Sequence, residues 1–366
     1  MTHKFIDEVC KEISKYPRPI NSSGANHTKN LIKEFAIKNN LSLNIEELKS
    51  KTIPTYFFLK AKKLVKLNIL NKFKEHVEGK IFIVEIEKLR YINTLEGYIP
   101  ILLIKDIVDI ELYKDKINDI KPKAVIFSLI TIDTSFYQRV FNFNMPVFSI
   151  SSKDLEYIEE MTYITLEPIK EEQTEIENIS FDIGRGPIVC IVTSISSKDD
   201  SYGAIYSASS VALSLGIAQS FCKNYNSDFR FRFLFTEEDN CDFEGVKKHI
   251  DKNLKHVYYA ISIFNMGWTN KSCFYEDAYG ENSLYMSEKF YKYAKSINQN
   301  IFFLKTKTMS FLHAPFKDKD IKTLMIGSYP CILSNTTYDN IESVKFEELY
   351  SWFEVLSGFL RRFHAL

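Results

Sequence analysis

The stretch from Pro187 to Gly245 decides the fold that the sequence predicts. It reads PIVCIVTSISSKDDSYGAIYSASSVALSLGIAQSFCKNYNSDFRFRFLFTEEDNCDFEG. An apolar run ends at Ser194, a polar loop and a helix-like segment follow, and a Phe-rich strand then leads to the adjacent carboxylates Glu237 and Glu238. In an open α/β sheet, sites form beyond the carboxyl ends of the strands. The order of strand, loop, helix and strand therefore predicts such a sheet, with a site near the two carboxylates.

The composition indicates a large folded protein without a dominant charge. Of the 366 residues, 45% are hydrophobic and 14% aromatic, and 47 Lys plus Arg balance 47 Asp plus Glu. This length suits two domains, or one large α/β domain that carries an insertion. A nucleic-acid partner would need clustered positive charge, so we expect none.

The cysteines and the first residues predict a cytoplasmic protein. The six cysteines are scattered and form no C-x-x-C pair, which is typical of reduced thiols inside a cell. The opening segment MTHKFIDEVCKEISKY has the pattern of an amphipathic helix and lacks the apolar core of a signal peptide. No apolar run approaches the ~20 residues of a membrane span, so we expect no membrane partner.

Strand and helix patterns divide the chain into two parts. Short Ile- and Val-rich runs with charged connectors recur within residues 49–169 and predict a smaller, β-rich inserted domain. The charged segment 170–180 is expected to be a linker. Residues 1–48 and 170–366 are expected to form one discontinuous α/β domain, in which a mostly parallel, mixed sheet is flanked by helices. The apolar run at 256–264 is expected to be a central parallel strand, covered on both faces.

Several motifs, taken in order, resemble the zinc aminopeptidases of metallopeptidase clan MH. They are IVTSISS, GAIY, the Glu-Glu pair, FNMG and FLHAPF. The clan includes leucyl-type aminopeptidases, glutamate carboxypeptidase and the transferrin receptor ectodomain. The resemblance covers most of residues 1–48 and 170–366 and implies a zinc-exopeptidase-like fold. The runs GKIFIVEI, KAVIFSL and MPVFSISSKD are similar to the protease-associated (PA) domain that many members carry as an insertion.

The resemblance implies a two-zinc site, but three of its ligand positions are replaced in this chain. Ser194 stands where the family has a His, Tyr206 where it has the bridging Asp, and Asn265 where it has a later Asp. Zinc needs imidazole, thiolate or carboxylate donors, normally three or four for each ion. A neutral Ser, Tyr and Asn set cannot offset the charge of a dication, so we expect no zinc at the first position.

The resemblance also implies roles for three retained residues. Glu237 would be the general base, and Glu238 and His313 would be ligands of the second zinc. Tyr206 could join them only as a phenolate, and the unperturbed pKa of a tyrosine is about 10. Without a metal to acidify water, Glu237 has no activated water to deprotonate. We therefore predict that all three roles are vestigial and that no cofactor is bound, with zinc expected only if the chain is active.

The same residues also have structural interpretations. The acidic residues from Glu237 onward are compatible with a solvated loop, and His313 with a loop histidine bonded to backbone. His249 and His256 flank a predicted helix and are expected at the surface. A Ser194–His313 dyad is a further catalytic alternative, although the chain has no G-x-S-x-G elbow.

These observations support three hypotheses about function. The first is a non-catalytic homologue of zinc-dependent aminopeptidases that acts in peptide or protein binding or in assembly, for which the transferrin receptor is the family precedent. The alternative is an active or weakly active metallo-aminopeptidase that hydrolyses N-terminal residues with a single metal at Glu238 and His313. The third is a self-associating structural protein, and the sequence is compatible with an oligomer in each case.

Overall fold

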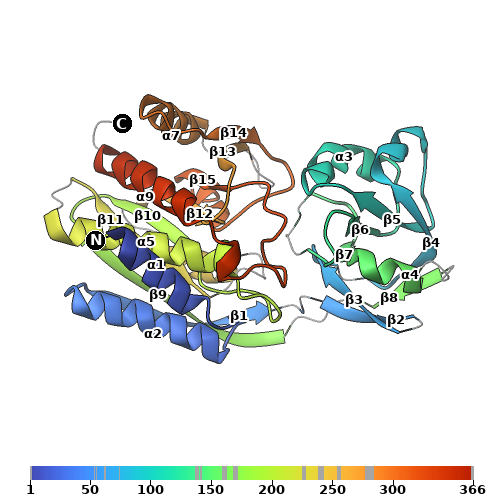
Figure 1. The fold of residues 1–366 in the computed structure, drawn as a ribbon, viewed down its shortest axis with the longest axis horizontal. Coiled ribbons are helices and arrows are strands. Elements are labelled where there is room, and N and C mark those ends of the chain that lie inside the picture. Colours follow the sequence, from blue (N-terminus) through green and yellow to red (C-terminus); the bar gives the residue numbers. More distant parts are fainter. Residues whose placement is uncertain are drawn as a thin grey trace.

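A computed structural model describes most of the chain. The residues that it describes are 2–52, 54, 56–61, 63–73, 75–136, 140, 142–158, 163–167, 172–224, 228–237, 243–253, 257–276 and 284–363. They form a mixed α/β fold with two sheets flanked by helices (Figure 1). The predicted fold class is confirmed.

The larger sheet contains eight strands among the described residues. In spatial order they are β1 (Leu43–Thr52), β9 (Glu172–Gly184), β11 (Arg230–Thr236), β10 (Ile188–Ser194), β12 (Val257–Phe264), β15 (Lys322–Ser328), β13 (Lys271–Glu276) and β14 (Phe302–Lys305). The block from β11 to β15 is parallel, and β9 and β1 extend it as antiparallel strands. Because β12 has parallel partners on both sides, its predicted central position is confirmed.

Helices cover both faces of the larger sheet. On one face, called the α5 face, lie α1 (Thr2–Ile13), α2 (Ser23–Lys38), α5 (Ser209–Asn224), α7 (Leu284–Ser296) and α9 (Phe346–Arg361), and on the other, the α6 face, lie α6 (Glu244–Asn253) and α8 (Ala314–Lys317). Side chains alternate between these faces along each strand. In β12, for example, Ile261 and Ile263 join the core of the α5 face, and Ala260 joins the core of the α6 face.

The helix at the centre of the α5 face is a longer apolar segment than the sequence analysis expected anywhere in the chain. The π-helical turn η3 (Ala204–Ala208) continues into α5, and Ala204–Lys223 is long and apolar enough, by length and composition, to cross a membrane. However, 78% of its most apolar window is buried inside the fold. A helix that is apolar all round can be a fully packed core helix, and α5 lies between the sheet, α1 and α9.

The smaller sheet is built from the chain between β1 and β9. In spatial order its strands are β2 (Tyr56–Lys60), β3 (Leu64–Ile69), β7 (Val147–Ile150), β6 (Val125–Leu129), β5 (Tyr98–Ile104), β4 (Val77–Glu85) and β8 (Tyr163–Leu166). The strands from β4 to β7 are parallel, and α3 (Val108–Asp119) connects β5 to β6. The Ile- and Val-rich runs of the sequence lie in these strands, as predicted.

The prediction of a linker at residues 170–180 is wrong. The strand β9 begins at Glu172 and pairs with β1 over residues 172–181 and with β11 over residues 178–184. Its backbone is thus hydrogen-bonded on both sides where the two ladders overlap, which the charged side chains of this segment conceal. The strand β1 of the larger sheet continues to Thr52. The proposed domain boundary between residues 48 and 49 stays a prediction.

An apolar cluster joins the two sheets. Phe127 and Ile104 of the smaller sheet pack in the same cluster as Phe264, Phe274 and Met325 of the larger one. Figure 1 shows the two parts as neighbouring lobes, with α3 of the smaller part turned toward β13 and β14. The smaller part therefore lies against the larger sheet near the carboxyl end of β12.

Candidate functional site

Ser194, the first replaced ligand position, is buried at the end of β10. Its Oγ accepts a hydrogen bond from the backbone N–H of Ser196 at 3.2 Å. The hydroxyl of Ser196 in turn donates to the backbone carbonyl of Glu237. These bonds close a short hydroxyl-rich turn, in which both serines are only 2% exposed. The structure thus gives Ser194 a local backbone-capping role.

Tyr206 and Asn265, the other two replaced positions, lie next to each other. Asn265 follows β12 with a φ of 52°, a left-handed conformation that asparagine tolerates, and its N–H donates to the carbonyl of Tyr206 at 3.3 Å. The ring of Tyr206 packs edge-on against Phe311 at 6.3 Å, and Phe311 lies 5.1 Å from the ring of Phe264. At the positions where the family has carboxylate ligands, this chain therefore has a tyrosine packed on an aromatic ring and an asparagine that accepts a hydrogen bond from Oγ of Ser334 at 2.8 Å.

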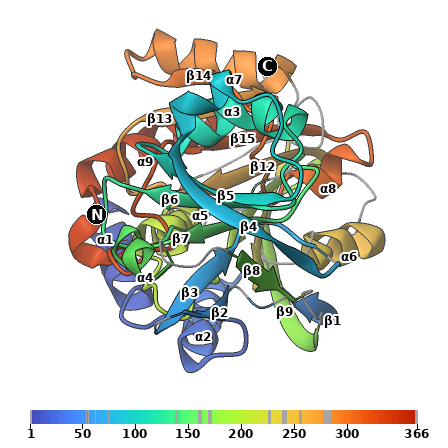
Figure 2. The same cartoon turned by 90° about the vertical axis from the view of Figure 1, so that its right-hand side faces the viewer.

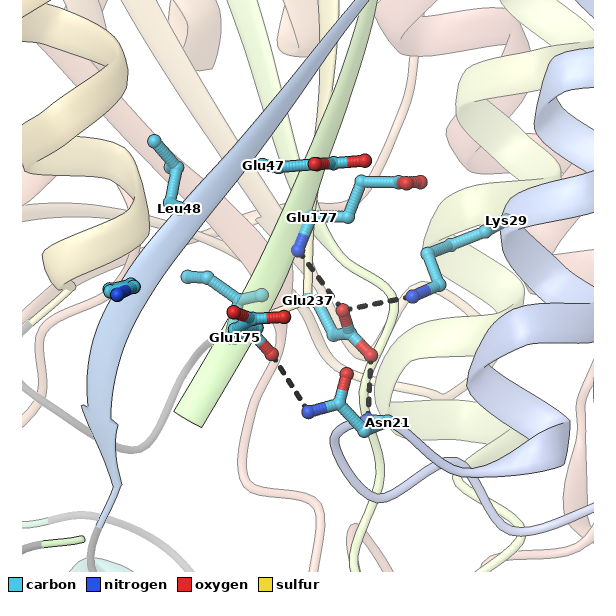
Figure 3. A pocket seen from close by; sticks show the side chains of 9 residues that line it. Asn21, Lys29, Glu47, Leu48, Glu175, Glu177 and Glu237 are labelled. Carbon is cyan, nitrogen blue, oxygen red and sulfur yellow. Dashed lines mark hydrogen bonds and ion pairs between the residues drawn. The ribbon is translucent and has the colours of Figure 1, made fainter. Parts of the chain in front are cut away.

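Glu237, the candidate general base, is fully buried and surrounded by hydrogen-bond donors (Figure 3). Its Oε1 accepts from the backbone N–H of Asn21 at 2.8 Å. Its Oε2 accepts from the N–H of Glu177 and from Nζ of Lys29, both at 3.1 Å. The side chain of Lys29 is only 9% exposed, so this is a buried ion pair between the end of β11 and α2. The contacts satisfy the carboxylate and tie β9, α2 and the loop before α2 together.

A cavity of about 360 Å³ opens beside this ion pair, between α2, β1 and β9. Its walls carry charges of both signs, from Glu47, Glu175 and Glu177 and from Lys29 and Lys49. The mixture suits a polar ligand and gives an apolar one little surface to contact.

His313 lies on the other face of the sheet. Its Nδ1 is 2.9 Å from Oγ of Ser262, and neither residue has any exposed surface. Ser262 lies between Ile261 and Ile263 in β12 and therefore points to the α6 face, where Leu312 and Ala314 also pack. Glu237 makes its contacts with α2 on the α5 face. The structure consequently places Glu237 and His313 in different surroundings. Nδ1 of His313 is paired with Ser262, and the Ser194–His313 dyad stays a prediction.

The described residues do not fit a zinc site of the kind that the resemblance implies. No group of three or more His, Cys, Asp or Glu side chains among them is arranged to hold a metal ion. Of the retained positions, Glu237 is occupied by Lys29 and backbone amides, and His313 faces a serine. Glu238 lies outside the described residues. We therefore derive no reaction step through a metal.

The loop after β10 is organised by Arg18, a residue that the sequence analysis missed. Its guanidinium is fully buried and donates to five backbone carbonyls and one hydroxyl. The acceptors are the carbonyls of Ile13, Tyr16, Ile195, Tyr202 and Gly203, and Oγ of Ser207. Burial lowers the pKa of Arg18 to about 10, which leaves it charged near neutral pH. The signal in the sequence is a lone arginine between two prolines, Pro17 and Pro19.

Asp339 provides the matching negative charge. It has no exposed surface and accepts from the N–H groups of Ile205 at 2.6 Å, Asn335 at 2.8 Å and Tyr206 at 3.3 Å. It thus caps the first turn of η3, where backbone N–H groups lack partners within the helix. Burial raises the pKa of Asp339 to about 6, although these backbone bonds and the nearby Arg18 oppose the rise.

A second buried polar cluster lies between β1 and α6. Nδ1 of His249 is 2.8 Å from Oε2 of Glu46, and Nδ2 of Asn253 donates to Oε1 of Glu46 at 2.6 Å. The predicted surface position of His249 is therefore wrong, because it is 1% exposed and pairs with a strand carboxylate. Burial alone would raise the pKa of Glu46, but the hydrogen bonds from His249 and Asn253 outweigh it and hold this pKa below its usual value. His256 lies outside the described residues.

Comparison with known sequences gives no family. No family model matches the chain, and no curated protein matches it.

Solved structures, in contrast, match over almost the whole chain. An aminopeptidase from Aneurinibacillus sp. strain AM-1 has a TM-score of 0.64 at 13% identity, covering 98% of this chain and 93% of its own. A zinc aminopeptidase from Bacillus subtilis has a TM-score of 0.62 at 17% identity, covering 100% and 94%. A peptidase M28 precursor from Shewanella amazonensis SB2B has a TM-score of 0.62 at 14% identity, covering 99% and 92%. Identities this low show the fold alone, and the chain has the fold of the zinc aminopeptidases.

Proposed function

We propose that this protein is a non-catalytic homologue of the zinc-dependent aminopeptidases that acts in peptide or protein binding or in assembly. One observation carries the proposal. The carboxylate of Glu237 is neutralised by Lys29 and bonded by two backbone amides on the α5 face, while His313 pairs with Ser262 on the α6 face. The two residues that the resemblance assigns to one centre thus make structural contacts on different faces of the sheet.

The contacts of Glu237 and of two replaced ligand positions support the same proposal. A general base needs a carboxylate that can reach the proton it removes, normally at about 2.6–3.2 Å or through one water. Glu237 instead directs both oxygens to donors of its own chain. The neutral Tyr206 packs against the ring of Phe311, and the neutral Asn265 accepts a hydrogen bond from the hydroxyl of Ser334, so both positions make contacts within the chain.

A binding role is compatible with what remains accessible. The cavity beside Glu237 exposes carboxylates and ammonium groups together, which suits the polar backbone or a charged end of a peptide. We further propose that the protein acts in the cytoplasm, with neither a nucleic acid nor a membrane as its partner, because its composition is neutral and its cysteines have the pattern of reduced thiols.

An assay of aminoacyl-substrate hydrolysis tests the proposal. Protein purified without chelators is incubated with a panel of aminoacyl chromogenic substrates, with and without added zinc or cobalt. We expect no turnover above that of the variant Glu237→Gln under any condition, with circular dichroism confirming that both proteins are folded.

The alternative is a metallo-aminopeptidase with a single metal at Glu238 and His313. It predicts metal-dependent turnover that Glu237→Gln abolishes and that His313→Ala also removes. Metal-dependent turnover by the natural chain that is lost in both variants, while both variants remain folded, would overturn the non-catalytic proposal.

A further inference from the structure

The strand β1 presents the longest uncovered edge of either sheet among the described residues. It has ten residues and forms one margin of the larger sheet, beside β9 (Figure 2). The other three margins are formed by β14, β2 and β8, which have four, five and four residues. Natural proteins usually keep edge strands short, because an uncovered edge pairs readily with another strand. The edge of β1 runs about 34 Å at the usual rise per residue.

Nothing in the described backbone interrupts this edge. The strand contains no proline, and its pairing with β9 runs without a bulge from Leu43 to Thr52. No backbone hydrogen bond from the described residues is recorded to the side of β1 that faces away from β9. Alternate residues of an antiparallel edge strand direct both their N–H and C=O groups outward, so β1 offers a regular row of donors and acceptors.

The charged side chains of β1 are self-complementary. Glu47 and Lys49 are exposed and lie two residues apart, so both project from the α5 face. In a symmetric antiparallel pair of β1 strands centred on Leu48, Glu47 of each copy lies opposite Lys49 of the other. Centring the pair on Glu47 or on Lys49 instead places like charges opposite each other, which is unfavourable. The charges therefore select one symmetric register out of the three.

Within one chain, the cross-strand neighbour of Glu47 has the same charge, so a cation from a second copy would be favourable beside it. Within the β1–β9 ladder, Glu47 lies opposite Glu177, a like-charged neighbour. Glu177 is compensated by Lys33 of α2 at 2.7 Å, whereas Lys49 lies opposite Glu175. A second copy centred on Leu48 would insert its Lys49 on the free side of Glu47. In the row of side chains across the four strands, Lys49 would then lie between two carboxylates, Glu175 of its own chain and Glu47 of the second copy.

We propose that the outer edge of β1 is a self-association surface, at which a second copy of this chain pairs antiparallel around a two-fold axis at Leu48. The larger sheets of the two copies then form one continuous sheet, joined by backbone hydrogen bonds and by two Glu47–Lys49 pairs. This is an isologous contact, which closes after two subunits. The inference does not depend on whether the protein is catalytic.

Charge reversal tests the surface without touching any buried residue. In Glu47→Lys the dimer would place Lys opposite Lys49, and in Lys49→Glu it would place Glu opposite Glu47. Each single variant should raise the dissociation constant of the dimer roughly tenfold to a hundredfold. An equimolar mixture of the two variants restores opposite charges at both positions, so it should form a heterodimer while each variant alone does not.

The measurement is sedimentation velocity of the full chain over a concentration series, with Glu8→Lys as a matched control. Glu8 is exposed on α1, so its reversal should leave self-association unchanged. A dimer of the natural chain that is lost in each single variant and restored in the mixture supports the proposal. A monomer at every concentration overturns it, and so does a dimer that tolerates both reversals or one that the mixture does not restore.

Discussion

Two retained polar residues, Glu237 and His313, have contrasting environments on the two faces of the larger sheet. On the α5 face, Glu237 is charged, meets an ammonium and two amides, and borders a polar cavity. On the α6 face, His313 meets a serine hydroxyl inside an apolar core. Glu237 therefore depends on the balance of charge, whereas His313 depends on packing and a hydrogen bond. The difference shows that residues assigned to one site from their order in the sequence can make separate structural contacts on different faces of a sheet.

The loop after β10 is also stabilised by buried charges, as Glu237 is on the α5 face. Arg18 and Asp339 are buried charges, and backbone groups satisfy most of their hydrogen bonds. This loop carries Ser194 and Tyr206 at its ends. Its shape is thus held by charges that come from the start and the end of the chain, and a metal is not needed to hold it.

The largest expected effect follows from Arg18. In Arg18→Met, five backbone carbonyls lose a charged donor, and a buried carbonyl without a partner costs about 1–3 kcal/mol. Because some carbonyls will find water, we expect the free energy of unfolding to fall by about 5 kcal/mol in all. Urea unfolding measures it, with Arg18→Lys as the control that keeps the charge but reaches fewer carbonyls. A loss below about 1 kcal/mol, typical of a surface pair, would contradict this role.

The next effect separates charge balance from packing on the α5 face. Lys29→Met leaves the carboxylate of Glu237 buried without its cation, and breaking a buried ion pair costs about 3–5 kcal/mol. The double variant Lys29→Met/Glu237→Gln removes both charges, so we expect it to recover more than half of that loss. Urea unfolding of the two single variants and the double variant forms a double-mutant cycle. Additive losses would show that the two side chains do not interact.

The titration of Asp339 gives a smaller effect with a defined sign. Burial raises its pKa from 3.8 to about 6, so the folded state binds this proton more tightly than the unfolded state does. Its contribution to stability is therefore complete below pH 3.8 and is lost as the pH rises through about 6. The loss should be about 3 kcal/mol, and Asp339→Asn should abolish it. Carbon NMR of the carboxyl group should show titration near pH 6, and a midpoint near 3.8 would refute the burial argument.

The smallest effect has the opposite sign and belongs to the α6 face. Hydrogen bonds hold the pKa of Glu46 below its usual value of 4.5, so its contribution is present above pH 4.5 and lost as the pH falls through the lowered value. The contribution should be about 1 kcal/mol, the net size of a typical single hydrogen bond. Stability curves of the natural chain and Glu46→Gln should converge at acid pH. A constant difference between them at all pH values would contradict the prediction.

Much of the fold could be predicted from the sequence, because its strands are buried on one or both faces. Alternating Phe231, Phe233 and Phe235, and the apolar run of β12, identify core strands directly. The strand β9 could not be identified in this way, since its first half carries charges next to α2 and shows no apolar face. Its conformation depends on ladders to β1 and β11, which are distant in sequence.

The candidate site was less predictable, because sequence order does not show which face a side chain takes. The motifs place Glu237 and His313 in the right order along the chain, but their partners Lys29 and Ser262 belong to other elements. Arg18 has no repeat or motif around it, and only its burial among carbonyls reveals its role. His249 is similar, since its partner Glu46 lies 203 residues away.

Zinc binding tests the central claim most directly. The claim is that the described residues use their retained polar groups for structure and do not assemble a metal centre. Isothermal titration of zinc into metal-free protein at neutral pH should show no saturable, stoichiometric binding, and the heat should be the same for His313→Ala. Saturable binding of one or two zinc ions to each folded chain, lost in His313→Ala, would contradict the account.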